Sequence, residues 1–267
     1  MAAQTLSRMV SRVSRDMLRG VSDFGYLIAL LGESFYWPVF GPRRKQPVRI
    51  EAVFTQMMQI GVEAIPILAV LTMAVGIMLA IQLVNTLELF GVESQVVLAV
   101  AKAMTREFGA LMTAILLAGR SGSALAARIG SMVVSQEIEA LRVMGIDPVR
   151  YLVVPAVIAF AIMTPALVVL ADAMGIIGGG LFSTGPLNMT METYIRTSIE
   201  VLTVGDVMQG LSKGLVFGIL IALVGCSAGF SVRGGAEGVG RATTRAVVLS
   251  LTYVIIVDMM FTWFMNV

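Results

Sequence analysis

The sequence predicts an all-α polytopic membrane protein with five membrane-spanning helices. Of its 267 residues, 57% are hydrophobic and only 13% are charged, whereas a soluble domain has about 25% charged residues. Long apolar stretches recur along the chain. In the first of them no charged residue lies between Glu63 and Glu88. Roughly 20 apolar residues in a helix cross a hydrocarbon core of about 30 Å, so each stretch is long enough to span a bilayer.

The five predicted spans are separated by short polar segments. They cover residues 63–87, 96–118, 151–180, 206–232 and 246–266. Residues 119–150 and the Gly-rich residues 233–245 are predicted as loops on one side of the membrane. Residues 183–205 form the longest loop on the other side.

The first 50 residues are predicted to lie along the membrane surface rather than to cross it. Arg8, Arg12, Arg15 and Arg19 recur every three or four residues, so they share one face of a helix. Such a basic, amphipathic helix is typical of the membrane interface. A solvated basic arm is the alternative. The predicted organisation is therefore an interfacial segment at 1–50 and a membrane domain at 51–267.

The distribution of Lys and Arg predicts the orientation. Eight basic residues precede the first span, and the loops at 119–150 and 233–245 carry most of the others. The opposite loops contain Arg196 against several glutamates. Because basic loops stay in the cytoplasm, the N-terminus is predicted to be cytoplasmic and the C-terminus to lie outside.

Charged residues within the spans are the first candidate functional group. Arg106, Glu107, Lys213 and Asp258 all fall in the outer half of their predicted spans. A charge in hydrocarbon is costly, so such residues face a partner or a cavity. Two interpretations stay open: a structural salt-bridge network, and a polar lining for a cavity that admits a charged headgroup. We expect Lys213 to pair with Glu107, Asp258 or both, which would leave Arg106 free.

A short amphipathic helix is predicted at residues 131–144, within the loop after the second span. Val134, Ile138 and Leu141 form its apolar stripe, and Glu137 is polar. The helix either lies on the headgroups or docks against a cytoplasmic partner by its apolar face.

Several kinds of chemistry are disfavoured by the composition. There is no His, and Cys226 is the single cysteine, so the commonest metal ligand and general base are missing. No Walker motif is present, so this chain is predicted to bind no cofactor, no metal and no ATP of its own. A secondary transporter that uses the four intramembrane charges as an ion relay remains an alternative. An intramembrane enzyme is disfavoured because no nucleophile lies beside a base.

Four short motifs follow one another with regular spacing between the second span and the last. They are Arg-Glu-Phe-Gly at 106–109, Ala-Gly-Arg-Ser-Gly-Ser-Ala at 118–124, Glu-Ile-Glu-Ala-Leu at 137–141 followed by Gly-Ile-Asp-Pro at 145–148, and Gly-Arg-Ala-Thr-Thr-Arg-Ala-Val-Val at 240–248. In this order they resemble the MlaE/YrbE family of permeases, over roughly residues 50–267.

The resemblance implies a permease subunit of an ABC transporter that moves phospholipid or a related lipid between the inner and outer membranes of a bacterial envelope. It implies a homodimer in the inner membrane, two ATPase subunits that carry ATP and Mg, Mce-domain substrate-binding subunits and a small STAS-like cytoplasmic subunit. By the same resemblance, the helix at 131–144 is similar to a coupling helix, which docks on the ATPase.

The resemblance also implies where the lipid binds. Arg106, Glu107, Lys213 and Asp258 match positions where family members also carry charged residues near the lipid cavity. In a dimer, we expect the cavity to lie on the two-fold axis and to be lined by apolar residues of the first span, such as Leu79, Leu83 and Leu87.

Overall fold

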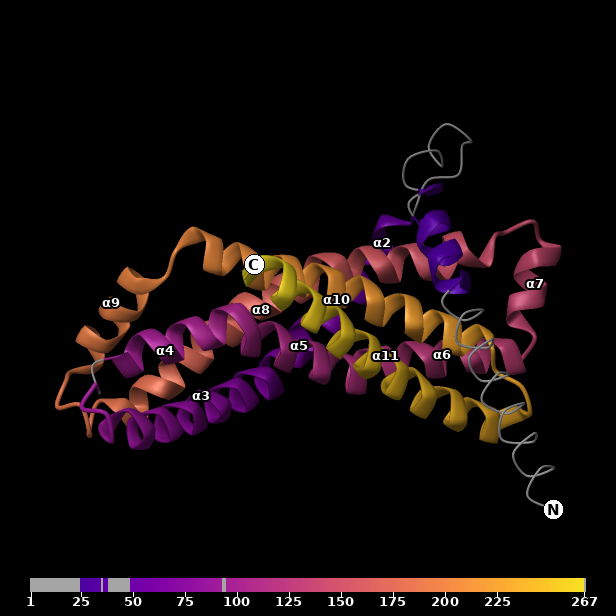
Figure 1. The fold of residues 1–267 in the computed structure, drawn as a ribbon. Helices are drawn as coiled ribbons and strands as arrows, with labels where there is room; N and C mark the ends of the chain where they lie inside the picture. The colour runs from indigo at the N-terminus through magenta and orange to yellow at the C-terminus, as the bar shows by residue number, and fades with distance from the viewer. Residues whose placement is uncertain (1–24, 35, 38–48, 93–94, 267) are drawn as a thin grey trace, which may run out of the picture.

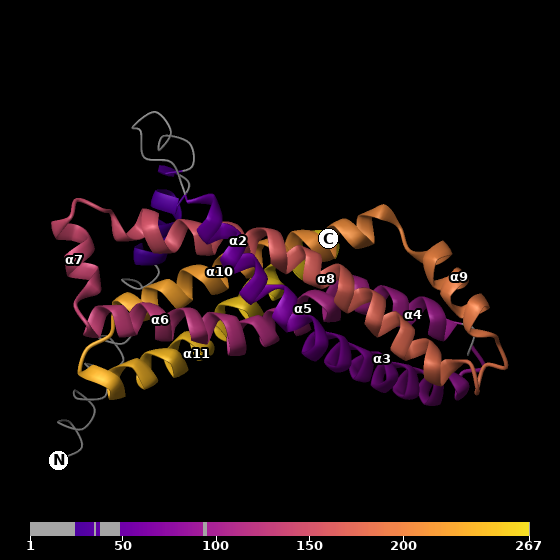
Figure 2. The same ribbon diagram turned by 180° about the vertical axis from the view of Figure 1, so that it is seen from behind.

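The computed structural model describes residues 25–34, 36–37, 49–92 and 95–266, and this part of the chain contains helices and no strand. Five helical segments within it are long and apolar enough to cross a membrane. Their bounds are Ile50–Glu88, Val96–Val134, Val149–Ser183, Val204–Phe230 and Gly235–Met265. They lie side by side in an elongated bundle (Figures 1 and 2). The predicted all-α fold with five spans is thereby confirmed.

The first span is broken near its start. Helix α2 (Ile50–Ile60) is followed by a 3-10 turn at Val62–Ala64 and then by α3 (Ile65–Glu88). Pro66 lies in the first turn of α3, where its missing N–H costs nothing. Figure 2 shows α2 at an angle to α3, so the two helices cover different parts of the bundle.

The second span is longer than predicted. It runs without interruption through α4 (Val96–Ala103), α5 (Gly109–Leu117) and α6 (Ser123–Val134), which are joined by π-helical segments at Met104–Phe108 and Ala118–Gly122. The predicted loop from 119 was wrong up to Val134. Residues of α6 such as Ala126 and Ile129 are buried, because α6 packs against α10 and α11.

The helix predicted at 131–144 is divided in two. Val134 is the last residue of α6, and Gln136 adopts a left-handed conformation with φ 62°. Helix α7 then covers Glu137–Val143. The predicted short helix between the second and third spans therefore exists, but it begins later and does not include Val134.

The remaining helices complete the bundle. They are α8 (Val154–Ser183), preceded by a π-helical turn at Val149–Val153, α9 (Met191–Val201), α10 (Val204–Phe230) and α11 (Gly235–Asn266). The predicted Gly-rich loop at 233–245 was wrong from Gly235 onward, since α11 begins there. Helix α7 and the turn between α10 and α11 lie at one end of the bundle, and α9 lies at the other (Figure 1).

The N-terminal prediction is tested only in part. Arg8, Arg12, Arg15 and Arg19 lie outside the described residues. Residues 25–34 are helical, and Leu27 and Leu30 within them are buried against the membrane domain.

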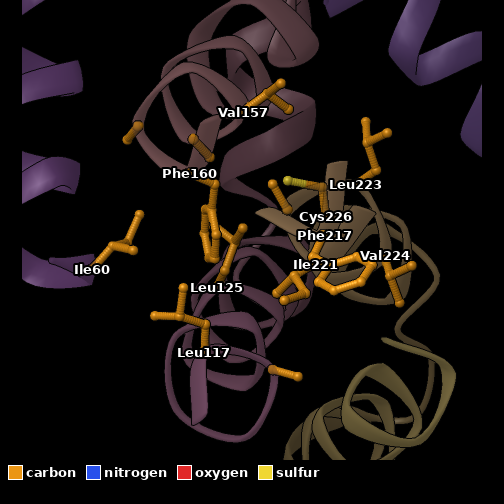
Figure 3. Close-up of a cluster of buried hydrophobic side chains, with 14 of the residues drawn as sticks. Ile60, Leu117, Leu125, Val157, Phe160, Phe217, Ile221, Leu223, Val224 and Cys226 are labelled. Atoms are coloured by element: carbon orange, nitrogen blue, oxygen red, sulfur yellow. The ribbon is translucent and has the colours of Figure 1, made fainter. Parts of the chain in front are cut away.

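The core joins α5, α6, α8 and α10. Figure 3 shows Phe160 of α8 beside Leu117 and Leu125 of the second span, with Phe217 and Ile221 of α10 nearby. Phe160, Phe217 and Ile221 are fully buried. This core holds the second, third and fourth spans together and so fixes the positions of their polar residues.

Candidate functional site

The first charged pair of the site lies on a π-helical segment. Arg106 and Glu107 belong to Met104–Phe108, where the second span changes from α4 to a wider helical turn. Single π-helical turns within α-helices occur frequently at functional sites. The second span begins at Val96, at the end of the bundle near α9, and Arg106 lies about 15 Å from Val96 along the helix axis. Both residues therefore lie well within the length of the span.

Lys213 of α10 is the centre of a network that joins three spans. Its side chain is fully buried, and its Nζ lies 2.5 Å from Oε2 of Glu107 and 2.8 Å from Oδ1 of Asp258. Nζ also donates to the hydroxyl of Thr262 over 3.1 Å, and that hydroxyl donates to Oε1 of Glu107 over 3.0 Å. The expected pairing of Lys213 with both acids is present, and it connects the second, fourth and fifth spans.

Arg106 does not belong to this network and is not free. Its Nε donates to Oδ1 of Asp206 over 2.5 Å. The expectation that Arg106 is unpaired was therefore wrong. Its side chain is nevertheless 39% exposed, whereas the side chain of Asp206 is 0% exposed. Only Nε of the guanidinium makes a hydrogen bond within the described part of the chain, so its two terminal nitrogens remain available.

Asp206 was not identified from the sequence as a residue of the site, although a local sequence signal places it at a helix start. Thr203 and Asp206 form a capping box at the start of α10: the Thr203 hydroxyl accepts from the Asp206 amide, and Oδ2 of Asp206 accepts from the Thr203 amide. A Thr followed three residues later by an acid, just before an apolar run, is typical of a helix start. The cap fixes the carboxylate, and its second oxygen then holds Arg106.

The three leucines predicted to line a lipid cavity lie beside the charged segment. Leu79, Leu83 and Leu87 of α3 are half-buried and pack against a cluster that includes Val96, Val100 and Met104. They therefore contact the helix that carries Arg106 and Glu107. Whether they line a lipid cavity in a dimer stays a prediction.

The apolar stripe predicted for docking does not form one exposed face. Ile138 and Leu141 are only 4% and 9% exposed because they pack into the core of this chain. Val134 is exposed but belongs to α6, and Glu137 accepts a hydrogen bond from Ser135. The apolar residues that α7 exposes lie at its end instead: Val143 is 89% and Met144 is 64% exposed.

The site and fold define a multi-pass membrane protein with an ionic network inside its helix bundle. Residues 53–264 match the model of the family described as Permease MlaE. The chain belongs to this family and is the transmembrane permease subunit of an ABC transporter, so ATP hydrolysis belongs to a partner ATPase. The family favours an ATP-driven permease over a secondary transporter or an intramembrane enzyme.

Three relatives agree with this assignment. A probable ABC transporter permease protein of Rickettsia typhi is 36% identical over 82% of this chain and 84% of its own length. A probable ABC transporter permease protein of Synechocystis is 37% identical over 79% of this chain and 80% of its own. The chloroplastic protein Trigalactosyldiacylglycerol 1 of Arabidopsis thaliana is 34% identical over 76% of this chain and 58% of its own.

Proposed function

We propose that this permease moves phospholipid or a related lipid between the inner and outer membranes of a bacterial envelope. It acts as a homodimer in the inner membrane, with two ATPase subunits that bind ATP and Mg, Mce-domain substrate-binding subunits and a small STAS-like subunit. The family supports lipid as the cargo, and the Arabidopsis relative is named after a glycolipid.

The observation that carries the proposal is the difference in burial and pairing between two cationic side chains, Lys213 and Arg106. Lys213 is fully buried and paired with two carboxylates, which is the arrangement of a structural charge. Arg106 is held at Nε by a buried aspartate and is partly exposed. A guanidinium held in this way presents its terminal N–H groups in a fixed orientation, which suits the oxygens of a phosphate. Arg106 is thus the residue proposed to bind the lipid headgroup.

The orientation proposed for the chain places α7 in the cytoplasm. The end of the bundle with α7 and the turn between α10 and α11 (Figure 1) contains Arg142, Arg233 and Arg241. Helix α9, at the opposite end, contains Glu192 and Glu200 with a single Arg196. The larger number of arginines at the α7 end supports a cytoplasmic location for it, because the distribution of Lys and Arg rather than net charge sets the orientation.

Replacing Arg106 by alanine tests the headgroup role. We expect Arg106→Ala to bind phospholipid about tenfold more weakly, since it removes hydrogen bonds to a charged group. Lipid that copurifies with the complex is measured by mass spectrometry, and ATPase is measured in the same preparation. Arg196→Ala is the matched control because Arg196 is an exposed arginine in α9, at the same end of the bundle. Loss of the ATPase with unchanged lipid in the remaining complex would show that Arg106 is structural only.

The exposed end of α7 is proposed to contact the ATPase. Val143 and Met144 are the large apolar side chains that α7 and its C-cap expose, and burying such a side chain contributes about 1.5–3 kcal/mol. The double variant Val143→Asp, Met144→Asp is expected to lose the ATPase in a pull-down. Val204→Asp is the control, since Val204 is 80% exposed at the start of α10. Retention of the ATPase by the double variant would contradict a docking role for this surface.

A further inference from the structure

A polar cavity lies between α2 and the second span, on the α7 side of the charged network. Its volume is about 260 Å³. Ile60, Leu125 and Phe160 give it an apolar floor, and the first two approach Phe160 from different helices (Figure 3). Its polar residues come from α2, from the 3-10 turn Val62–Ala64, from the π-helical segment Ala118–Gly122 and from α6. The cavity is therefore amphipathic, with an apolar base and a polar rim.

Three polar side chains of this rim have no hydrogen-bond partner within the described residues. The Oγ atom of Ser121 is buried and makes no hydrogen bond. Gln56 is only 7% exposed, and its amide is likewise without a partner in the described chain. Arg128 forms no ion pair there although it also lines the cavity. Because buried polar groups are normally satisfied, the Ser121 hydroxyl indicates a polar occupant, and the exposed Arg128 beside it supplies an unpaired positive charge.

The charge of the cavity favours an anion. Arg120 is already neutralised, since its Nη2 lies 2.7 Å from Oε2 of Glu63 and its Nη1 donates to the carbonyl of Gln59. The charge of Arg128 is left over, which gives the cavity a net charge of about +1. Its N–H groups, the Ser121 hydroxyl and the Gln56 amide are all able to donate to the oxygens of a phosphate.

The cavity lies in the half of the second span that is nearer to α7. Arg128 lies about 9 Å, and Arg120 about 21 Å, along the helix axis from the end of α6 at Val134. A basic pocket between spanning helices on the cytoplasmic side is the kind of site that binds lipid headgroups. The second span thus carries two arginines on π-helical segments, Arg106 towards the α9 end and Arg120 towards the α7 end.

We propose that this cavity binds the phosphate of an anionic phospholipid from the leaflet on the α7 side. Arg128 donates to the phosphate, and Ser121 and Gln56 donate to its oxygens or to the adjoining ester. Ile60, Leu125 and Phe160 form the floor beneath the phosphate, and the acyl chains stay outside this cavity of about 260 Å³. This site is separate from Arg106 and its proposed role, and it makes the permease responsive to the composition of that leaflet.

Thermal unfolding of the purified full-length protein in detergent tests the site, with phosphatidylglycerol in mixed micelles as the probe. Ligands that bind the folded state raise its melting temperature. We expect phosphatidylglycerol to stabilise the unaltered protein, and Arg128→Gln to need about tenfold more lipid for the same shift. Ser121→Ala is expected to melt at the same temperature as the unaltered protein without lipid, since its hydroxyl bonds nothing there, and to show a smaller lipid-dependent shift.

Arg241→Gln is the matched control because Arg241 is an exposed arginine at the same end of the bundle. It removes the same charge outside the cavity and is expected to keep the full shift. The proposal is overturned if Arg128→Gln and Ser121→Ala both respond to phosphatidylglycerol like the unaltered protein. It is also overturned if inorganic phosphate alone gives a shift that Arg128→Gln abolishes, or if Arg128→Gln instead dissociates a dimer on size-exclusion chromatography.

Discussion

Lys213→Ala is expected to destabilise the membrane domain by about 3–5 kcal/mol, the usual cost of removing one partner of a buried ion pair. The alanine leaves Glu107 and Asp258 close together without the cation that now lies 2.5 and 2.8 Å from them. It also removes a donor to Thr262. Because these groups come from three spans, the loss loosens α10 and α11 against the second span. The midpoint of unfolding in detergent measures the effect.

A neutral replacement of the whole network separates lost packing from stranded charge. The triple variant Lys213→Met, Glu107→Gln, Asp258→Asn keeps similar volumes and has no unpaired charge, so it is expected to recover most of the stability. Lys102→Ala, in α4, should have little effect, because no ion pair of Lys102 is present in the described chain. An exposed ion pair contributes at most about 1 kcal/mol. If Lys213→Ala lowers the free energy of unfolding by no more than this, the network does not hold the spans together.

Gly76→Ala is expected to have the second large effect, because α3 and α8 are in backbone contact there. A Cβ atom at Gly76 would overlap the carbonyl group of Gly175. Close backbone approach at small residues is a common way for membrane helices to pack. Since the obstacle is backbone, no side chain can rotate away, and the helices must separate. We expect a loss at the upper end of, or above, the roughly 1–3 kcal/mol of ordinary overpacking.

Gly119→Ala is the matched control for Gly76→Ala. Gly119 lies in the π-helical segment Ala118–Gly122, and a Cβ atom there would meet nothing within 4 Å. Alanine at an open helical position stabilises by about 0.4–1 kcal/mol, so the two identical substitutions should change the melting temperature in opposite directions. Equal effects would show that the approach of α3 to α8 is not tight.

The sequence predicted the spans well because membrane thickness requires a minimum apolar length. It also predicted the pairing of Lys213, since an isolated charge at that depth is costly. It failed where a helix continues beyond the apolar stretch. Residues 119–134 contain Arg, Ser and Gly, and residues 235–245 contain Arg, Thr and Gly. These residues are typical of loops between spans, yet contacts among α6, α10 and α11 support both segments as helices.

The site was predicted less completely, and for a physical reason. Periodicity identifies an apolar face but not what covers it, so Ile138 and Leu141 were assigned to a partner although this chain buries them. Asp206 was placed at the outer end of a span as an ordinary boundary residue. Its pairing with Arg106 across about 100 residues depends on how the second and fourth spans are aligned, which the apolar lengths alone do not determine.

Transfer of phospholipid driven by ATP tests the central claim most directly. The permease and its ATPase are reconstituted in vesicles with labelled phospholipid, together with the Mce-domain subunit that receives or supplies it. We expect labelled lipid to appear on, or leave, the Mce-domain subunit only when ATP is hydrolysed, and Arg106→Ala to slow this transfer while ATPase binding persists. Hydrolysis of ATP by an intact complex without any movement of lipid would contradict a lipid permease.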